Sequence, residues 1–587
     1  MVNHDGGSPD SWVSPAFADL LRRSVEAGVA EQRAMAGAVL GEVDMVSFGP
    51  ALMKTCIGLA RHPVQLATSW TRYSTGLLRA SLAAGVRLTG QPVDGPVPER
   101  RDKRFADPTW SESPWFWWLR QTFELTERLA GELVAEAEVD EEARLKAAFA
   151  VQAVLDAMAP TNVPLMNPAV VKRAYETGGL SLARGLRNFL DDLATNNGQP
   201  RQVMPGAFEV GRDLAVTPGK VVFRNDLMEL IQYVPQTDEV HEIPLLFSPP
   251  WINKYYIMDL APGRSLVEWA VQHGHTVFTI SYRNPDASMG GVRLDDYLLS
   301  GPRAALDVIT EITGAEKVNL LGLCLGGTLA MALLAYLDAT GDDRINSATF
   351  LNTLVDFSEP GGLGVFTDEA TVSRLEKKMA RTGFLAGESM RATFDLMRGN
   401  DLIWGYVVNN WMLGNDPPAF DLLTWNADST RMPAGMHAFY LRSCYMENRL
   451  AKGEMELAGQ LLDLGTVGQD VYVLAAEQDH IAPWRSSYKG ALLPKGAARF
   501  VLSNSGHIAG IVNPPGPKSR HWVGADAELP ADPDAWRQQA VEHQGTWWED
   551  WATWIGERAG ERRPPPRIGS DLHRPQRDAP GEYVLGR

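Results

Sequence analysis

The chain has 587 residues, more than a single hydrophobic core normally serves, so at least two domains are expected. Its formal net charge of −17 disfavours nucleic acid and anionic membrane surfaces as partners, because an acidic protein is attracted to neither. Only three cysteines occur, which argues against a disulfide framework and predicts a reducing, cytoplasmic setting. No signal peptide is expected, because residues 1–10 are polar and lack a basic flank and an apolar core. No transmembrane segment is expected either, since no apolar run is long enough to span a membrane.

Residues 1–198 are predicted to form a helical domain, because helix formers dominate between Ser11 and Leu193 and no convincing strand appears. A dense aromatic cluster interrupts this part at Trp110, Trp115, Phe116, Trp117 and Trp118. We favour the interpretation that these rings fill the helical core; the alternative is an apolar face that meets a polymer or a second protomer. A polar linker at 196–200, which contains Gly and Pro, is expected to separate this domain from the next.

Residues 199–587 are predicted to form a catalytic α/β domain, because short apolar runs alternate there with helix-forming segments. The expected strands are 221–223, 230–234, 243–247, 276–281, 317–321, 347–352, 471–476 and 498–502. This arrangement predicts the sheet of an α/β-hydrolase fold.

The strand at 317–321 leads into the sequence G-x-C-x-G-G and then into a helix-forming segment. This is the pattern of a nucleophile elbow, with Cys324 in the serine position and glycines where strand and helix nearly touch. The alternative is an ordinary buried cysteine in a strand-to-helix turn. We favour the elbow, which would expose the Cys324 thiol at the carboxyl edge of the sheet.

The gap between the strands ending at 352 and starting at 471 is too long for a simple crossover, so an inserted cap is expected at about 355–465. Its aromatic residues are predicted either to cover Cys324 or to form the cap's own core: Trp404, Trp411, Phe420, Trp425, Phe439, Tyr440 and Tyr445. From about residue 562 the chain is rich in Pro, Arg and Asp, which predicts an extended or loosely held tail.

An elbow nucleophile needs an acid and then a base, each on a loop after a strand. Asp479 follows the strand at 471–476, and His507 follows the strand at 498–502, in the required order. His480 competes for the role of base, but adjacent side chains on an extended loop point apart, so a secondary or structural role is expected for it. The other histidines lack a cysteine or carboxylate cluster at ligand spacing, so no metal site is expected.

An oxyanion hole in this fold uses the amide after the nucleophile and a second amide from the loop after an early strand. Leu325 supplies the first amide. For the second, Pro249 and Pro250 have no N–H to offer, which leaves Trp251 or Ile252.

With these motifs in place, the chain resembles the polyhydroxyalkanoate synthases, also called poly(3-hydroxyalkanoate) polymerases, over most of its length. The similar stretches are 249–260, 274–278, 281–286, 322–327, 420–426, 479–484, 505–510, 547–548 and 580–584. Cys324, Asp479 and His507 fall on the family's triad. The length and the amino-terminal extension look like the single-subunit classes, which argues against an obligatory partner protein.

The resemblance implies polymerisation of (R)-3-hydroxyacyl-CoA into polyhydroxyalkanoate, with release of CoA, through a thioester on Cys324. It implies no cofactor, since the CoA thioester is the substrate, and a cytoplasmic homodimer associated with the surface of polymer granules. In family terms His507 activates Cys324, while Asp479 orients His507 or assists in activating the hydroxyl. Two other functions stay open: a Cys-dependent esterase or thioesterase, and a non-catalytic granule-binding protein.

Overall fold

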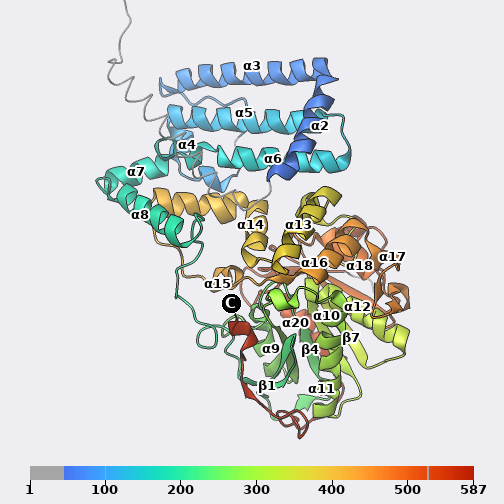
Figure 1. Ribbon diagram of the computed structural model, residues 1–587. Helices are drawn as coiled ribbons and strands as arrows, with labels where there is room; N and C mark the ends of the chain where they lie inside the picture. Colours follow the sequence, from blue (N-terminus) through green and yellow to red (C-terminus); the bar gives the residue numbers. More distant parts are fainter. Residues whose placement is uncertain (1–44, 99–100, 525–527, 587) are drawn as a thin grey trace, which may run out of the picture. The chain divides into compact units, whose positions relative to one another are not determined.

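The computed structural model describes residues 45–98, 101–524 and 528–586, and the chain divides into two compact units (Figure 1). The first unit comprises the chain up to Met204 together with Ala392–Pro418, and the second comprises Pro205–Arg391 and Ala419–Arg587. The boundary expected at 198 lies close to this division, and the part of the expected helical domain before residue 45 lies outside the described residues. The segment Ala392–Pro418 differs from expectation, because it was assigned to the cap.

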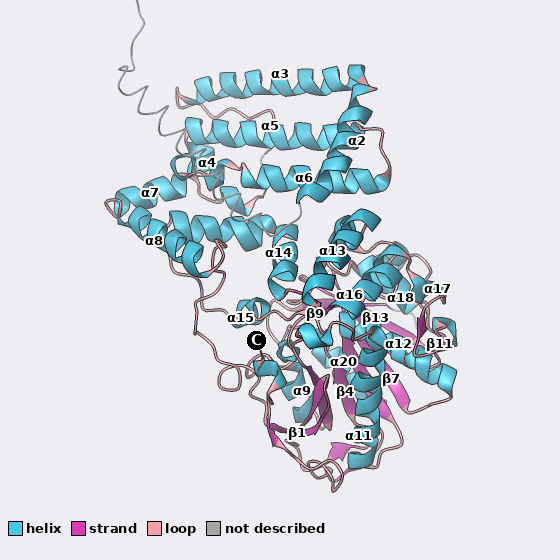
Figure 2. Ribbon diagram, viewed as in Figure 1, coloured by secondary structure: helices cyan, strands magenta, loops and turns pink. Residues whose placement is uncertain are grey.

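Within its described residues the first unit contains helices and loops only (Figure 2). The helices α3, α5 and α6 lie side by side (Figure 1). Asp140 caps the start of α6, where its carboxylate accepts the Ala143 amide at 2.8 Å. The α-helices of this unit are α2 (Gly49–Ala60), α3 (Pro63–Arg87), α4 (Thr109–Glu112), α5 (Pro114–Glu136), α6 (Glu141–Ala157), α7 (Pro168–Glu176) and α8 (Leu180–Thr195).

The aromatic cluster that precedes and opens α5 belongs mainly to the core of this unit. Trp110 and Trp117 are each 1% exposed, and Trp110 packs edge-on against Phe105 with ring centroids 4.8 Å apart. Trp115 is the exception, with 55% of its surface exposed. The core interpretation therefore describes most of these rings.

The returning segment Ala392–Pro418 completes a second cluster in the core of the first unit. Trp404 and Trp411 are buried there with Val407, against Ala153 and Phe189. The prediction that these two tryptophans belong to a cap was wrong, because their apolar surface is buried against helices of the amino-terminal part of the chain.

The second unit is built on an eleven-stranded sheet in the order β15-β14-β13-β12-β7-β6-β4-β5-β2-β1-β17. The six strands from β13 to β5 in this order pair in parallel, and the remaining pairs are antiparallel. The strands are β1 (Gly219–Arg224), β2 (Met228–Tyr233), β4 (Leu245–Ser248), β5 (Val277–Tyr282), β6 (Val318–Leu323), β7 (Ile345–Leu351), β12 (Asp470–Ala476), β13 (Ala498–Ser503), β14 (Arg520–Val523), β15 (Val541–Gln544) and β17 (Arg577–Asp578). All eight strands predicted from the sequence are present.

Side chains of alternate residues in the central strands pack into two separate cores, one on each face of the sheet. In β6, Leu320 belongs to the core shared with α10, α11, α12 and α18, and Leu321 to the core shared with α9 and α20. Helices therefore cover both faces, as a mostly parallel sheet requires. These helices are α9 (Leu266–Gln272), α10 (Leu294–Leu298), α11 (Ala304–Thr313), α12 (Leu325–Thr340), α18 (Trp484–Ala491) and α20 (Trp547–Gly556).

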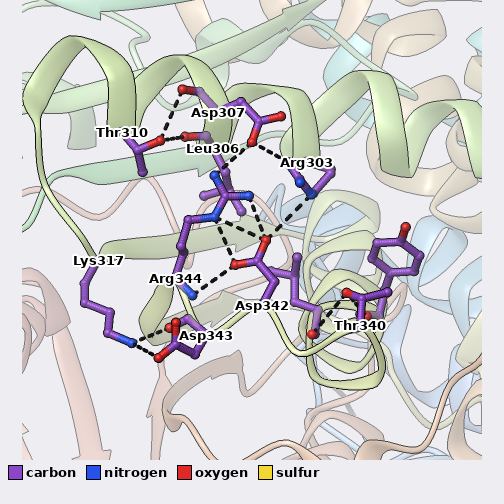
Figure 3. Close-up of polar contacts among 11 residues, drawn as sticks. Arg303, Leu306, Asp307, Thr310, Lys317, Thr340, Asp342, Asp343 and Arg344 are labelled. Atoms are coloured by element: carbon purple, nitrogen blue, oxygen red, sulfur yellow. Dashed lines mark hydrogen bonds and ion pairs between the residues drawn. The ribbon is translucent and has the colours of Figure 1, made fainter.

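A charged network ties the layers together at the amino ends of β6 and β7 (Figure 3). Arg344, just before β7, donates to Asp307 of α11 at 2.8 Å and to Asp342 at 2.7 Å. Lys317, just before β6, pairs with Asp343 at 2.9 Å. Because β6 and β7 are parallel, the opposite end of these strands is left for the polar loops described below.

The parts of the insertion between β7 and β12 that lie outside Ala392–Pro418, together with the carboxyl-terminal tail, complete the second unit. The tail is extended but not loose, since β16 (Arg562–Arg563) pairs with β3 (Val240–His241) and β17 pairs with β1. The regular elements of the insertion are α13 (Glu369–Thr382), β8 (Phe384–Leu385), α14 (Gly387–Met397), α15 (Asp421–Ala427), β9 (Met432–Pro433), α16 (Ala434–Tyr440), α17 (Arg449–Lys452), β10 (Glu456–Leu457) and β11 (Gln460–Leu461). None of the helices in the described parts of the chain combines the length and the apolar character needed to cross a membrane.

Candidate active site

Cys324 stands at the turn between β6 and α12 in a strained backbone conformation. Its φ is 51° and its ψ is −118°, a region that residues with a side chain rarely adopt. Its amide donates to the Leu351 carbonyl of β7 at 2.9 Å, which anchors the turn to the neighbouring strand. The turn has the geometry of the predicted nucleophile elbow, and the Cys324 side chain is only partly buried.

The glycines of the G-x-C-x-G-G sequence are required by close backbone contacts. A Cβ atom at Gly322 would lie 2.5 Å from the Gly327 Cα, and one at Gly326 would lie 2.1 Å from the Ser248 carbonyl oxygen. One at Gly327 would lie 2.0 Å from the Thr353 hydroxyl oxygen. The strand, the helix and the loop after β4 can therefore meet at Cys324 only because these side chains are absent.

Asp479 and His507, on the loops after β12 and β13, meet as predicted from their positions. The Asp479 Oδ2 atom lies 2.6 Å from His507 Nδ1. The second carboxylate oxygen accepts the amides of Ile481 at 2.8 Å and Ala482 at 2.9 Å, so both oxygens are fixed. Asp479 is thus engaged by His507, whereas the neighbouring His480 contributes its backbone carbonyl to the amide of Gly362 at 3.1 Å.

Burial by itself would lower the pKa of His507, but the Asp479 carboxylate and the Cys324 sulfur raise it well above its usual value. The three groups are therefore electrostatically coupled, and the Asp479 carboxylate favours the protonated form of the His507 imidazole.

Asn352, at the carboxyl end of β7, supports His507 and was not predicted from the sequence. It is fully buried with a φ of 44°, and its side-chain amide donates to the backbone carbonyl of His507. The signal that could have revealed it is a polar residue directly after an apolar strand, at the sheet edge where Cys324 was expected.

The loop after β4 lies directly against the elbow, which is what a second oxyanion donor requires. Trp251 is 3% exposed, and Ile252 packs on the same core as Leu325. Leu325 is the first residue of α12, where an amide has no acceptor within its own helix. The candidate donors Leu325, Trp251 and Ile252 are thus brought to one region of the molecule.

Aromatic side chains of the insertion surround this region. Tyr440 contacts Tyr445 edge-on, with centroids 5.6 Å apart, and Trp251 lies 6.1 Å from Tyr440 in the same way. Burial, and to a lesser degree the nearby Cys324 sulfur, raises the pKa of both tyrosines. The segment around 440–445 therefore lies in the neighbourhood of Cys324, where Tyr440 is part of the core of the second unit. Cys444, in the same segment, is buried, and burial raises the pKa of its thiol.

The sheet order, the elbow and the two loops identify the chain as an α/β-hydrolase-fold protein with cysteine at the nucleophile position. Its residues 259–514 match the family model of the alpha/beta hydrolase fold, and residues 101–270 match that of the poly-beta-hydroxybutyrate polymerase (PhaC) N-terminus.

Curated relatives cover nearly the whole chain. A poly(3-hydroxyalkanoate) polymerase of Methylorubrum extorquens is 46% identical, over 90% of this chain and 89% of the relative. A poly(3-hydroxyalkanoate) polymerase subunit of Cupriavidus necator is 42% identical, over 90% of each. One of Rhizobium meliloti is 44% identical, over 85% of this chain and 82% of the relative. The chain belongs to the poly(3-hydroxyalkanoate) polymerase family and is an enzyme of that family.

Proposed function

We propose that the chain is an acyltransferase that takes (R)-3-hydroxyacyl units from CoA thioesters and joins them into polyhydroxyalkanoate, through a thioester on Cys324. The observation that carries the proposal is the strained elbow at Cys324 beside the His507–Asp479 pair, in a chain of the polymerase family. Cys56 is exposed outside the second unit's sheet and Cys444 is buried with a raised pKa, so neither competes as a nucleophile.

In the first step His507 takes the proton of the Cys324 thiol, and the thiolate attacks the thioester carbonyl carbon of the acyl-CoA. A carbon–sulfur bond to Cys324 forms while the bond to CoA breaks. The CoA sulfur leaves with the proton that His507 held. One thioester replaces another at nearly equal energy, so the acyl group stays activated for the next step.

In the second step the hydroxyl group of a 3-hydroxyacyl unit gives its proton to His507, and its oxygen attacks the thioester on Cys324. An ester bond forms, the bond to the Cys324 sulfur breaks, and the sulfur is ready for another cycle. Asp479 stabilises the imidazolium through its hydrogen bond to Nδ1, and assistance to the incoming hydroxyl is its alternative role.

Each step creates a negative oxygen on the carbonyl carbon. The amide of Leu325 and that of Trp251 or Ile252 would bind it, and losing one such donor costs about 100- to 1000-fold in rate in comparable sites. No metal or cofactor is needed for either step.

A competing reaction is attack of water on the acyl-enzyme, which would make the chain an esterase or thioesterase. The aromatic residues Tyr440, Tyr445 and Trp251 around Cys324 support polymerisation, since they limit access of water. The deciding experiment supplies 3-hydroxybutyryl-CoA and analyses the products. Insoluble polyester with CoA supports the proposal, and free 3-hydroxybutyrate with CoA supports the esterase. Absence of CoA release from several acyl-CoAs would favour a non-catalytic granule-binding protein.

An exposed apolar face in the first unit supports binding to the polymer surface. Apolar residues of α8 spaced at one helix face remain exposed: Leu182 (41%), Leu186 (57%), Leu190 (52%) and Leu193 (52%). A run of this kind favours an apolar partner over water, and a polyester granule is such a surface. We propose a cytoplasmic enzyme that works at the granule surface, with a homodimer as its functional form.

A further inference from the structure

The side chain of Lys254, at the end of the loop between β4 and the 3-10 turn Tyr255–Ile257, is buried. Lys254 is 6% exposed, and its ammonium group donates to the carbonyl of Val584 at 2.5 Å and to that of Gly586 at 3.1 Å. It also pairs with Asp428 at 3.0 Å. An ammonium group has three hydrogens to donate, and the acceptors here come from two segments far away in the sequence.

The first of these segments belongs to the insertion. Residues 425–430 run beside loop residues 251–256, where Asn253 and Ser429 form an antiparallel bridge. Three hydrogen bonds join the two segments: Trp425 Nε1 to the Lys254 carbonyl at 2.8 Å, the Tyr256 hydroxyl to Asp428 at 3.0 Å, and the Thr430 hydroxyl to the Trp251 carbonyl at 2.8 Å. The position of the loop therefore depends on the position of this part of the insertion.

The second segment comprises residues 582–586, the last that the structure describes. Its backbone is held by Glu229 of β2, whose carboxylate accepts the amides of Glu582 at 2.8 Å and Tyr583 at 2.9 Å. Val584 itself is buried at 2% exposure, so one of the two carbonyls that Lys254 binds belongs to a buried residue. The last residues thus complete the surroundings of a buried charge.

The loop that Lys254 holds also touches the elbow. The Ser248 and Pro249 backbone lies so close to Gly326 that a Cβ atom there would be 2.1 Å from the Ser248 oxygen. A shift of the loop would therefore change the distance between the amides of Trp251 or Ile252 and the amide of Leu325. A buried ammonium that loses an acceptor is strongly destabilised, so Lys254 resists such a shift.

We propose that Lys254 is a positioning residue that sets the second amide of the oxyanion hole, by joining the loop to Asp428 of the insertion and to the carbonyls of Val584 and Gly586. This inference rests on the proposed function, because it assumes that Cys324 forms a thioester. It makes acylation depend on two distant segments: the insertion must be in place, and the carboxyl-terminal residues must be present.

The test compares two reactions of the Cys324 thiol. Acylation by 3-hydroxybutyryl-CoA passes through an oxyanion, whereas alkylation by iodoacetamide displaces iodide and needs only the thiolate. Lys254→Met should slow single-turnover acylation about 100-fold, the effect of a misplaced oxyanion donor, and leave iodoacetamide alkylation within about threefold of the unsubstituted enzyme. Lys317→Met, which removes an exposed lysine–aspartate pair at the other end of β6, is the matched control and should change neither reaction.

A second variant, a chain ending at residue 583, removes the two carbonyl acceptors and keeps Lys254. In this variant too, acylation should be slowed while alkylation stays nearly unchanged. The truncated chain therefore still tests the proposal if Lys254→Met fails to fold. Normal acylation in either variant, or an equal loss of both reactions in the folded truncated chain, would overturn the positioning role. If the unsubstituted enzyme is alkylated but never acylated, the proposed function itself fails, and that result is distinct from the others.

Discussion

Asp479 Oδ2 and His507 Nδ1 lie 2.6 Å apart, although 27 residues and a complete helix–strand unit separate the two residues in the chain. The parallel pairing of β12 with β13 places both loops at one sheet edge, so the two side chains meet without either being near the other in sequence. The amides of Ile481 and Ala482 then hold the other carboxylate oxygen. The pair is therefore pre-organised beside Cys324.

Replacing the nucleophile should separate catalysis from folding. Cys324→Ala is expected to abolish polymer formation and covalent acyl labelling, because Cys324 is the cysteine at the elbow. The measurement is incorporation of radiolabelled 3-hydroxybutyryl units. Cys56→Ala is the control and should keep most activity, since Cys56 is exposed on α2. Labelled monomer bound to Cys324→Ala would refute the mechanism.

The roles of base and acid can be distinguished by rapid quenching. His507→Gln should slow formation of the acyl-enzyme itself, because without a base only a small fraction of a thiol is ionised at neutral pH. If Asp479 acts mainly on the incoming hydroxyl, Asp479→Asn should form the acyl-enzyme and then stall. Equal loss of the acylation step in both variants would restrict Asp479 to orienting His507.

The elbow glycines should be intolerant of any side chain. Gly326→Ala would place Cβ 2.1 Å from a backbone oxygen, so the unfolding free energy is expected to fall by at least about 2 kcal/mol, with loss of acylation. Gly131→Ala, in α5, has no heavy atom within 4 Å of its Cβ position and should instead stabilise the chain by about 0.5–1 kcal/mol. Urea unfolding of both variants checks this contrast. Comparable stabilities would show that the backbone at Cys324 can move apart.

Asp259 should make stability depend on pH, mainly between about pH 4 and pH 6. It is buried next to the hydroxyls of Thr217 and Ser265, and burial raises its pKa to about 6. Because this folded-state pKa lies above the unfolded value of about 3.9, stability is fully present below pH 4 and declines as pH rises through 6. The loss amounts to about 3 kcal/mol at pH 8.

The measurement is the free energy of unfolding of the native chain and of Asp259→Asn at pH 5 and pH 8. The variant cannot ionise at this position, so the difference between the two proteins should shift in its favour by about 1.4 kcal/mol over that interval. A difference that stays constant between the two pH values would show that Asp259 is ionised throughout.

The elements that the sequence predicts well are those with local signals. The elbow is defined by a pattern of six consecutive residues, and the eight predicted strands are short apolar runs. Both can therefore be recognised from the local sequence, without knowledge of the fold. Asp479 and His507 could be predicted because each directly follows such a strand. Asn352 was missed because its role lies in a hydrogen bond to the His507 backbone, which no local pattern encodes.

The assignments that failed depend on contacts between remote segments. Trp404 and Trp411 look like any aromatic residues of an insertion, and only their packing against Ala153 and Phe189 assigns them to the first unit. Lys254 resembles an ordinary loop lysine until its acceptors are known, and these belong to residues 428, 584 and 586. Contacts between residues more than a hundred positions apart are determined by the topology of the fold, and the periodicity of the sequence does not reveal them.

The return of Ala392–Pro418 to the first unit means that the catalytic part cannot be isolated by a single cut near residue 204. A fragment spanning 205–587 would carry the rings of Trp404 and Trp411 and the side chain of Val407 without the helices that bury them. Three large apolar side chains would become exposed together, and the fragment would tend to aggregate. Deleting 392–418 with a short linker in its place removes that liability. Conversely, residues 1–204 expressed alone would lack a part of their unit's interior, because Trp404, Val407 and Trp411 would be missing.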